Sequence, residues 1–79
     1  MTKNQPLDCH KKYIIKGYHK NIDRGYRQVL LTMGLIPGAT FLVKRFAPFS
    51  RTLQIDLEQY SLSLREAELQ SVILEPSHI

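Results

Sequence analysis

The stretch from Asp23 to Pro48 constrains the fold most, because it reads as a capped helix, a tight turn and a strand in direct succession. Asp23 is a typical N-cap residue, since its carboxylate accepts the free backbone N–H groups of the first helical turn. A helix that begins there places residues spaced three and four apart on one face. The predicted buried stripe consists of Tyr26, Val29, Leu30 and Met33.

The end of this helix and the turn after it are also marked in the sequence. Gly34 follows the stripe directly, at a point where a left-handed residue commonly ends a helix. Pro37 and Gly38 predict a tight turn, because proline fixes φ and glycine allows a positive φ at the next position. Residues 40–46 are β-branched and aromatic, which predicts a strand that ends before Pro48.

The remaining segments predict four further short strands. Residues 13–18 form the first, with Tyr13 and Ile15 directed inward and a bend or bulge at Gly17. Residues 52–58 alternate apolar and polar side chains, which predicts a strand with one buried face. Its inward residues are Leu53, Ile55 and Leu57.

The last third of the chain continues this pattern. Residues 60–64 alternate again, residues 65–69 favour a single 3₁₀ turn, and residues 72–74 form a last strand that ends at Pro76. We therefore predict a mainly β fold. It is a small five-stranded barrel with one short α-helix between the first two strands and a one-turn helix before the last.

Composition limits the architecture to one domain. The 79 residues contain 43% hydrophobic and 23% charged side chains, which is ordinary for a globular domain. We expect a flexible arm over residues 1–11, a folded domain over residues 12–75 and a tail over residues 76–79. Apolar runs fall far short of the ~20 residues that span a bilayer, and no segment resembles a signal peptide. With the single cysteine Cys9, these features favour a cytoplasmic location.

Three motifs together resemble the FeoA family: Tyr26–Gly38, Arg45–Pro48 and Leu62–Arg65. The resemblance implies a small cytoplasmic accessory protein of bacterial ferrous iron uptake with an SH3-like barrel. Apart from the resemblance, the residues of the chain themselves predict no enzymatic activity and no cofactor. The implied partner is the cytosolic part of a FeoB-like permease, a membrane protein with a GTP-binding domain. The chain departs from the family pattern at Phe49–Thr52, where the family usually has a Leu-Gly-Asp-Pro-like turn.

Residues that carry catalytic or metal chemistry are sparse. No histidine is placed near a candidate Ser or Cys nucleophile with an orienting acid, and no phosphate-binding glycine loop is present. Four metal donors lie near the first strand: Asp8, Cys9, His10 and His19. They lack the C-x-x-C or H-x-x-x-H spacing that typical metal sites use, so we predict no metal site.

Apolar residues at the helix–turn–strand junction are the candidates for partner binding. Leu31 lies about 100° around the helix from the buried stripe, at its rim. We expect it to form an apolar patch near one end of the barrel with Leu35, Pro37, Phe46 and Phe49. The predicted partner-binding residues are Leu31, Leu35, Pro37 and Phe49.

The net charge of +4 leaves other functions open. A small basic barrel that binds nucleic acid is the main alternative, with Tyr13, Tyr18 and Phe49 as stacking platforms. A further alternative is a weak enzyme or a GTPase activator, with Arg24, Arg27 or Arg51 as an arginine finger. Retention of the protein on DNA or RNA at low salt would distinguish the nucleic-acid alternative from a protein-interaction module.

Overall fold

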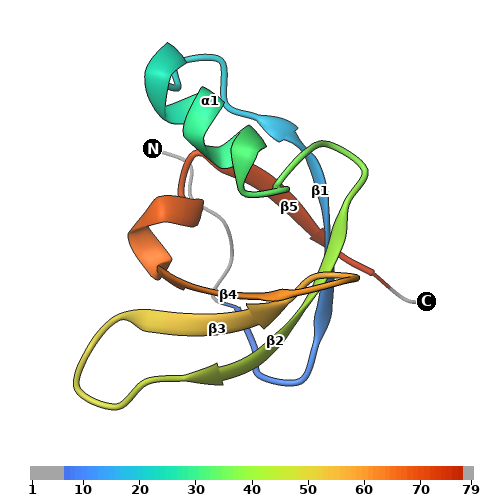
Figure 1. The fold of residues 1–79 in the computed structure, drawn as a ribbon, viewed down its shortest axis with the longest axis vertical. Helices are drawn as coiled ribbons and strands as arrows, with labels where there is room; N and C mark the ends of the chain where they lie inside the picture. Colours follow the sequence, from blue (N-terminus) through green and yellow to red (C-terminus); the bar gives the residue numbers. More distant parts are fainter. Residues whose placement is uncertain (1–6, 78–79) are drawn as a thin grey trace.

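The structure is a computed structural model that describes residues 7–77 (Figure 1). Its elements confirm the predicted mainly β order, with one α-helix after the first strand and one 3₁₀ turn before the last. In chain order they are β1 Lys12–Tyr18, α1 Arg24–Thr32, β2 Thr40–Phe46, β3 Thr52–Asp56, β4 Ser61–Arg65, η1 Glu66–Leu69 and β5 Val72–Pro76.

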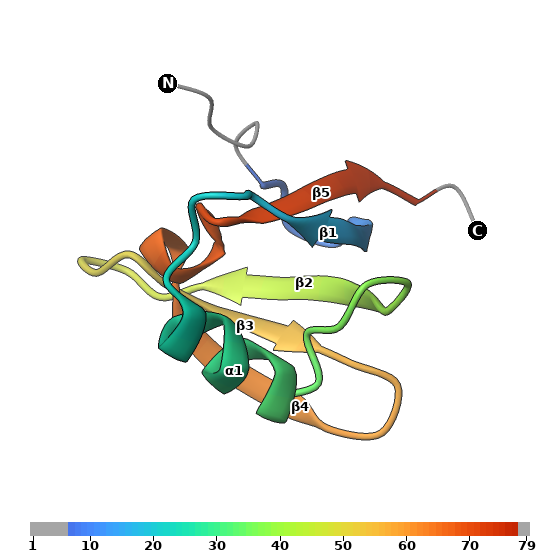
Figure 2. The same cartoon turned by 90° about the horizontal axis from the view of Figure 1, so that it is seen from above.

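All five strands belong to one antiparallel sheet in the order β4-β3-β2-β1-β5. β5 therefore returns to pair with β1, although the two strands are separated by nearly the whole chain. The 3₁₀ helix η1 carries the chain from β4 at one edge to β5 at the other, and the sheet curls around the interior (Figures 1 and 2). This curling gives the sheet the partly closed form of a small barrel.

Two breaks in strand register accompany the curvature. The pairing of β1 with β5 shifts between Ile15 and Gly17, as the sequence predicted for Gly17. The pairing of β2 with β3 shifts between Val43 and Arg45. An extra residue in one strand bends it and increases its local twist, which helps a short sheet to curl.

The core lies inside the curl and is built from alternate strand residues. Ile15, Val43 and Ile55 are fully buried at the centre of three neighbouring strands. The helix contributes Leu30, and Leu7 packs against the same cluster from the N-terminal side. The other buried residues are Tyr13, Leu35, Phe41, Leu53, Leu64, Leu69 and Val72. Leu57, which was predicted to point inward with Leu53 and Ile55, is only partly buried.

The helix buries a narrower stripe than its sequence predicted. Asp23 caps it as expected, since its Oδ2 atom accepts a hydrogen bond of 3.0 Å from the Tyr26 backbone N–H. Leu30 is fully buried, but Val29 is 50% exposed, so its assignment to the stripe was wrong. The physical reason is that α1 lies over one end of the sheet, where only the side around Leu30 meets the core (Figure 1).

The segment before β1 is docked where the structure describes it. The Asp8 backbone N–H donates to the Tyr13 hydroxyl at 2.9 Å, and the His10 N–H donates to the Val43 carbonyl at 2.6 Å. Residues 1–6 of the predicted arm and residues 78–79 of the predicted tail lie outside the described range. Within residues 7–77, no helix is long and apolar enough to cross a membrane.

Candidate partner-binding surface

The junction between α1 and β2 is shaped by the end of the helix. Gly34 has φ of +88°, as the sequence predicted. The Gly34 N–H donates to the Leu31 carbonyl at 3.0 Å, and the Leu35 N–H donates to the Leu30 carbonyl at 3.1 Å. These two bonds form a Schellman motif, in which the residue after the left-handed glycine packs back against the last helical turn.

This motif explains a correction to the predicted partner-binding residues. Leu35 is the residue after the left-handed glycine, and it is fully buried beside Leu30. A fully buried side chain is not available to a partner, so the expectation that Leu35 lies in an exposed patch was wrong. The helix-end motif determines that the Leu35 side chain is buried, and the spacing of apolar residues along the sequence does not reveal this.

Tyrosine hydroxyl groups fasten α1 and its C-terminal connection to the rest of the molecule. Tyr26 of α1 donates to the Glu68 carbonyl of η1 at 2.9 Å. Tyr60, which precedes β4, donates to the Met33 carbonyl, and Tyr18 at the end of β1 donates to the Leu35 carbonyl. Each bond ties a helix-end segment to a different element, so the junction is held in one arrangement.

The pKa values of two of these tyrosines, Tyr18 and Tyr26, are raised. Burial raises the pKa of Tyr18 above its ordinary value, and the neighbouring Arg27 charge opposes that rise. Burial also raises the pKa of Tyr26, and the Glu68 carboxylate adds to the effect. Both hydroxyl groups therefore stay protonated at neutral pH and act as hydrogen-bond donors.

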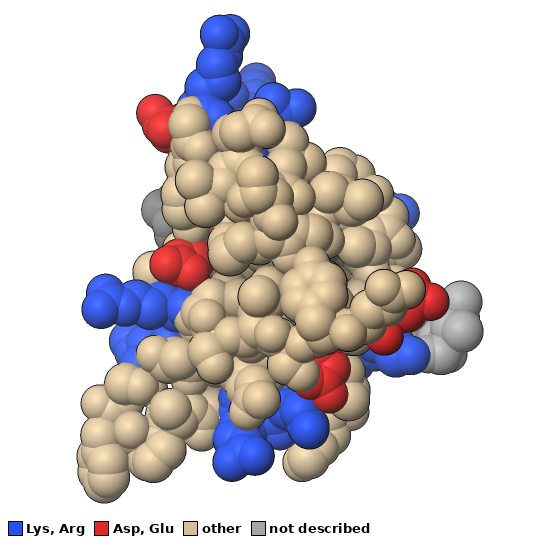
Figure 3. Space-filling view, viewed as in Figure 1, with Lys and Arg blue, Asp and Glu red and all other residues tan. Residues whose placement is uncertain are grey.

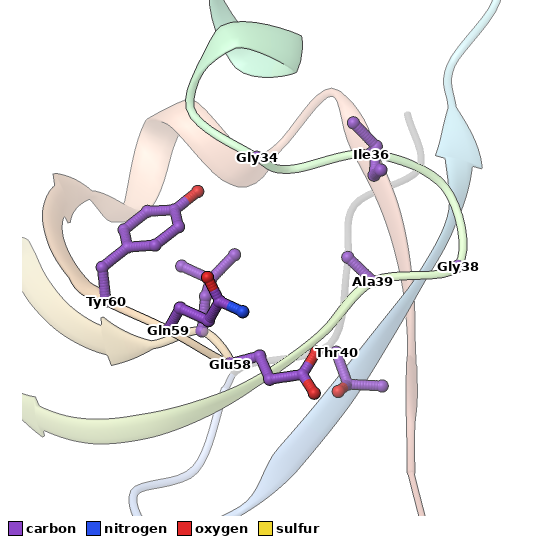
Figure 4. A pocket seen from close by; sticks show the side chains of 9 residues that line it. Gly34, Ile36, Gly38, Ala39, Thr40, Glu58, Gln59 and Tyr60 are labelled. Carbon is purple, nitrogen blue, oxygen red and sulfur yellow. The ribbon is translucent and has the colours of Figure 1, made fainter.

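A hollow of about 280 Å³ opens beside this junction. It lies between the connection of residues 34–40 and the turn of residues 57–60, and Figure 4 shows the Tyr60 hydroxyl directed toward Gly34. Ile36 and Tyr60 contribute exposed apolar surface to its lining, each being 46% exposed. The hollow is lined by Gly34, Ile36, Gly38, Ala39, Thr40, Leu57, Glu58, Gln59 and Tyr60.

The four predicted partner-binding residues do not form one patch. Leu31 is half-buried in the last turn of α1, and Pro37 is exposed in the following connection. Phe49 is fully exposed with φ of +62° in the β2–β3 loop. Pro37 precedes β2 and Phe49 follows it, so the seven residues of that strand, about 20 Å of extended chain, separate them (Figures 1 and 2).

The structure adds surface residues that sequence reasoning missed. Ile36 and Tyr60 line the same hollow, although they lie 24 positions apart in the chain. An aromatic residue in a polar turn, such as Tyr60 after Gln59, was the available signal. Phe46, the fifth member of the expected patch, is 36% exposed at the Phe49 end of β2.

The four potential metal ligands of the sequence are not gathered into a group. In the range 7–77, no three His, Cys, Asp or Glu side chains lie close enough to hold a metal ion together. Cys9 is exposed with a free thiol, and the Asp8 carboxylate lies 3.9 Å from the Lys11 ammonium group.

Comparison with known proteins identifies relatives with the same fold. The FeoA domain family matches residues 5–76. An NMR structure of a protein from Pseudomonas aeruginosa is 43% identical, with a TM-score of 0.72, and the match covers 89% of this chain and 93% of that one. An FeoA-like protein from Clostridium acetobutylicum is 25% identical, with a TM-score of 0.79 over 100% of this chain and 95% of that one.

A third structure identifies the fold. The FeoA of Stenotrophomonas maltophilia, crystallised in complex with zinc and described as an SH3 domain protein, is 15% identical. It aligns with a TM-score of 0.69 over 87% of this chain and 84% of that one, which confirms the predicted SH3-like fold. The family match also confirms that the chain is a non-enzymatic accessory protein associated with ferrous iron transport. The match over residues 5–76 shows that this chain belongs to the FeoA family.

Proposed function

We propose that this protein modulates ferrous iron uptake by binding the cytosolic part of a FeoB-type permease. The observation that carries the proposal is the FeoA match over residues 5–76, which associates nearly the whole chain with ferrous iron transport. A small domain without catalytic groups acts on a transporter through contact, so its surface is where function resides. In support of a modulating role, the Stenotrophomonas maltophilia FeoA is put forward as a ferrous iron transport activating factor.

The binding surface that we propose is the α1–β2 junction. It combines Ile36 and Tyr60, which line the 280 Å³ hollow, with the half-buried Leu31 of the last helical turn and the exposed Pro37 of the connection. Apolar groups on a rigid backbone lose little entropy when a partner covers them, and such clusters supply most of the binding energy in many interfaces. The tyrosine hydrogen bonds to Met33 and Leu35 supply that rigidity.

Phe49 supports a second, separate contact. Its ring is fully exposed at the end of the sheet opposite the junction, next to Pro48. A partner that reached both sites would have to span the length of β2. We therefore propose the junction as the principal site and the Phe49 loop as an additional one.

The nucleic-acid alternative has less support on this surface. Tyr13 is buried and packs against Phe41 with ring centroids 6.0 Å apart, so it offers no face for a base. The ring of Tyr18 is covered by the Arg27 guanidinium group, 5.8 Å from its centroid. Of the three expected stacking platforms, Phe49 keeps an open face.

Co-purification with the permease tests the proposal. The tagged chain is mixed with the cytosolic part of the permease, with and without guanine nucleotide. We expect retention of the permease fragment, and the nucleotide arms show whether binding depends on the state of its GTP-binding domain. Failure to retain the fragment in every nucleotide state would overturn the proposal.

A further inference from the structure

A second hollow, of about 590 Å³, lies at the N-terminal side of α1. It is formed by the end of β1, the connection into the helix and the first turns of the helix. Its lining residues are Gly17, Tyr18, His19, Lys20, Ile22, Arg24, Arg27 and Pro37. Every charged side chain in this lining is basic, and none is an aspartate or glutamate. We call this site the basic hollow.

The ion pairing of the cations in the basic hollow bears on what the hollow binds. In the part of the chain that the structure describes, Lys20, Arg24 and Arg27 form no ion pair within 4.0 Å. The nearest acid in the sequence is Asp23, whose carboxylate already accepts the Tyr26 N–H as the helix cap. Figure 3 shows Lys and Arg atoms at this end of the molecule, with acidic atoms beside them and further Lys and Arg atoms elsewhere on the same face.

One of these cations is held in place. The Arg27 guanidinium group lies 5.8 Å from the centroid of the Tyr18 ring, and the Tyr18 hydroxyl is anchored to the Leu35 carbonyl. Stacking on a fixed ring restricts the arginine and leaves the edge of its guanidinium group free to donate. A planar, restricted guanidinium group is well suited to paired hydrogen bonds with a carboxylate.

The lining also contains apolar surface between the charges. Ile22 is half-buried and Pro37 is exposed, and both lie in the wall of the hollow. An ion alone would leave these groups uncovered, and a flat bilayer surface does not enter a concavity. Because Arg27 lies over the Tyr18 ring, that side of the ring is not open to a nucleic-acid base.

We propose that the basic hollow binds a segment of another protein in which acidic side chains flank an apolar one. The carboxylates pair with Arg24, Arg27 and Lys20, and the apolar side chain lies against Ile22 and Pro37. Charge complementarity supports this choice of ligand, since the charged side chains of the lining, Lys20, Arg24 and Arg27, are all cations and the lining has no carboxylate. The basic hollow shares Pro37 with the proposed junction surface, but it has no lining residue in common with the 280 Å³ hollow. The proposal does not depend on the identity of the permease.

A peptide titration tests this site directly. The probe is a fluorescein-labelled peptide of sequence Glu-Glu-Leu-Glu-Glu, and its control has glutamine in place of each glutamate. Fluorescence anisotropy at low salt should show saturable binding of the acidic peptide and at least about tenfold weaker binding of the control. Arg27→Glu should lower the affinity for the acidic peptide by at least about tenfold, whereas Lys12→Glu should change this affinity by less than about twofold.

Lys12 is the matched control because it is also exposed and gives the same change in net charge, yet lies at the opposite end of β1. Equal weakening by the two variants would show attraction to net charge alone and would overturn the proposal. If Arg27→Glu fails to fold, NMR of the original protein during titration with the acidic peptide locates the binding site instead. Peptide-induced shifts at residues 17–27 support the site, and shifts confined to other residues contradict it.

Sedimentation with vesicles separates a membrane from a protein ligand. We expect vesicles containing phosphatidylserine to retain little protein at an ionic strength where the acidic peptide still binds. The opposite outcome would be that the vesicles retain the original protein but not the Arg27→Glu variant, and that the acidic peptide does not bind. That outcome would assign the hollow to anionic lipid and overturn the proposal.

Discussion

The hydroxyl group of Tyr60 occupies the space that a side chain at Gly34 would need. A Cβ atom on Gly34 would overlap the Tyr60 hydroxyl oxygen and lie 3.1 Å from the ring carbon that bears it. The same hydroxyl donates to the carbonyl of Met33, the residue before the glycine. Tyr60 and the end of α1 therefore fit together in this arrangement because residue 34 is glycine, and both residues line the junction hollow.

We predict that Gly34→Ala destabilises the domain by about 2–4 kcal/mol, since it combines a φ of +88° with the overlap at Tyr60. Tyr60→Phe alone should cost about 1 kcal/mol through loss of the bond to Met33. Urea unfolding of both single variants and the double variant measures the coupling. Gly34→Ala should cost less in the Tyr60→Phe background, and equal costs would contradict the proposed overlap.

The turn glycine at position 38 tests backbone conformation alone. Its φ is +94°, and a Cβ atom there would meet nothing within 4 Å. Gly38→Val should therefore destabilise by about 1–3 kcal/mol solely because a β-branched residue resists positive φ. Gly17→Val is the matched control, because Gly17 has open space as well and lacks the positive φ.

Thermal and urea unfolding compare these two variants. The free energy of unfolding of Gly17→Val should lie within about 0.5 kcal/mol of that of the original protein. Similar losses at the two positions would mean that side-chain bulk, and not the turn conformation, sets the cost.

Local backbone chemistry made much of this fold predictable. Asp23, Gly34 and Gly38 each act within a few residues, so their roles as cap, helix end and turn were readable from the sequence. The bulge at Gly17 was readable for the same reason. Alternation in β3 likewise identified Leu53 and Ile55 as buried, because strand periodicity is local.

Contacts between distant segments were not predictable in this way. Leu35 is buried because the helix end folds it back, and Val29 is exposed because no other element covers it. The tyrosine hydroxyl bonds join residues 17 to 42 positions apart, which no periodicity reports. The expected patch failed because β2 separates Pro37 from Phe49, a consequence of strand length.

The helix cap gives a prediction on a single hydrogen bond. Asp23→Ala removes the acceptor of the Tyr26 N–H and should destabilise the domain by about 1 kcal/mol. Asp23→Asn retains an oxygen acceptor and should cost clearly less. Chemical denaturation of the two variants measures the difference, and equal costs would show that the capping bond is not what Asp23 contributes.

The stability of the domain at high pH should depend on the partly buried tyrosines Tyr18 and Tyr26. Burial raises the pKa of Tyr18 and Tyr26 in the folded protein, while unfolded tyrosine titrates near its ordinary value of about 10. Below that value both states keep the proton, so this contribution to stability is fully present. Above it the unfolded state releases protons first, and the contribution is lost as pH rises through the folded pKa values.

Urea unfolding at about pH 8 and about pH 11 measures this loss. The variant with Tyr18→Phe and Tyr26→Phe should lose less stability between the two values than the original protein does. An identical loss would assign the pH dependence to other groups, such as the lysines.

Titration of the cytosolic part of the permease with this protein, by calorimetry, tests the central claim most directly. We expect saturable binding that Leu31→Glu abolishes, because a charge would then enter the apolar junction. Val29→Glu should bind normally, since it makes the same change on the same helix about 200° away. If Leu31→Glu unfolds the domain, Ile36→Glu, at an exposed position of the same junction, should abolish binding instead. Undiminished binding by a folded junction variant, or no binding by the original protein, would contradict the account.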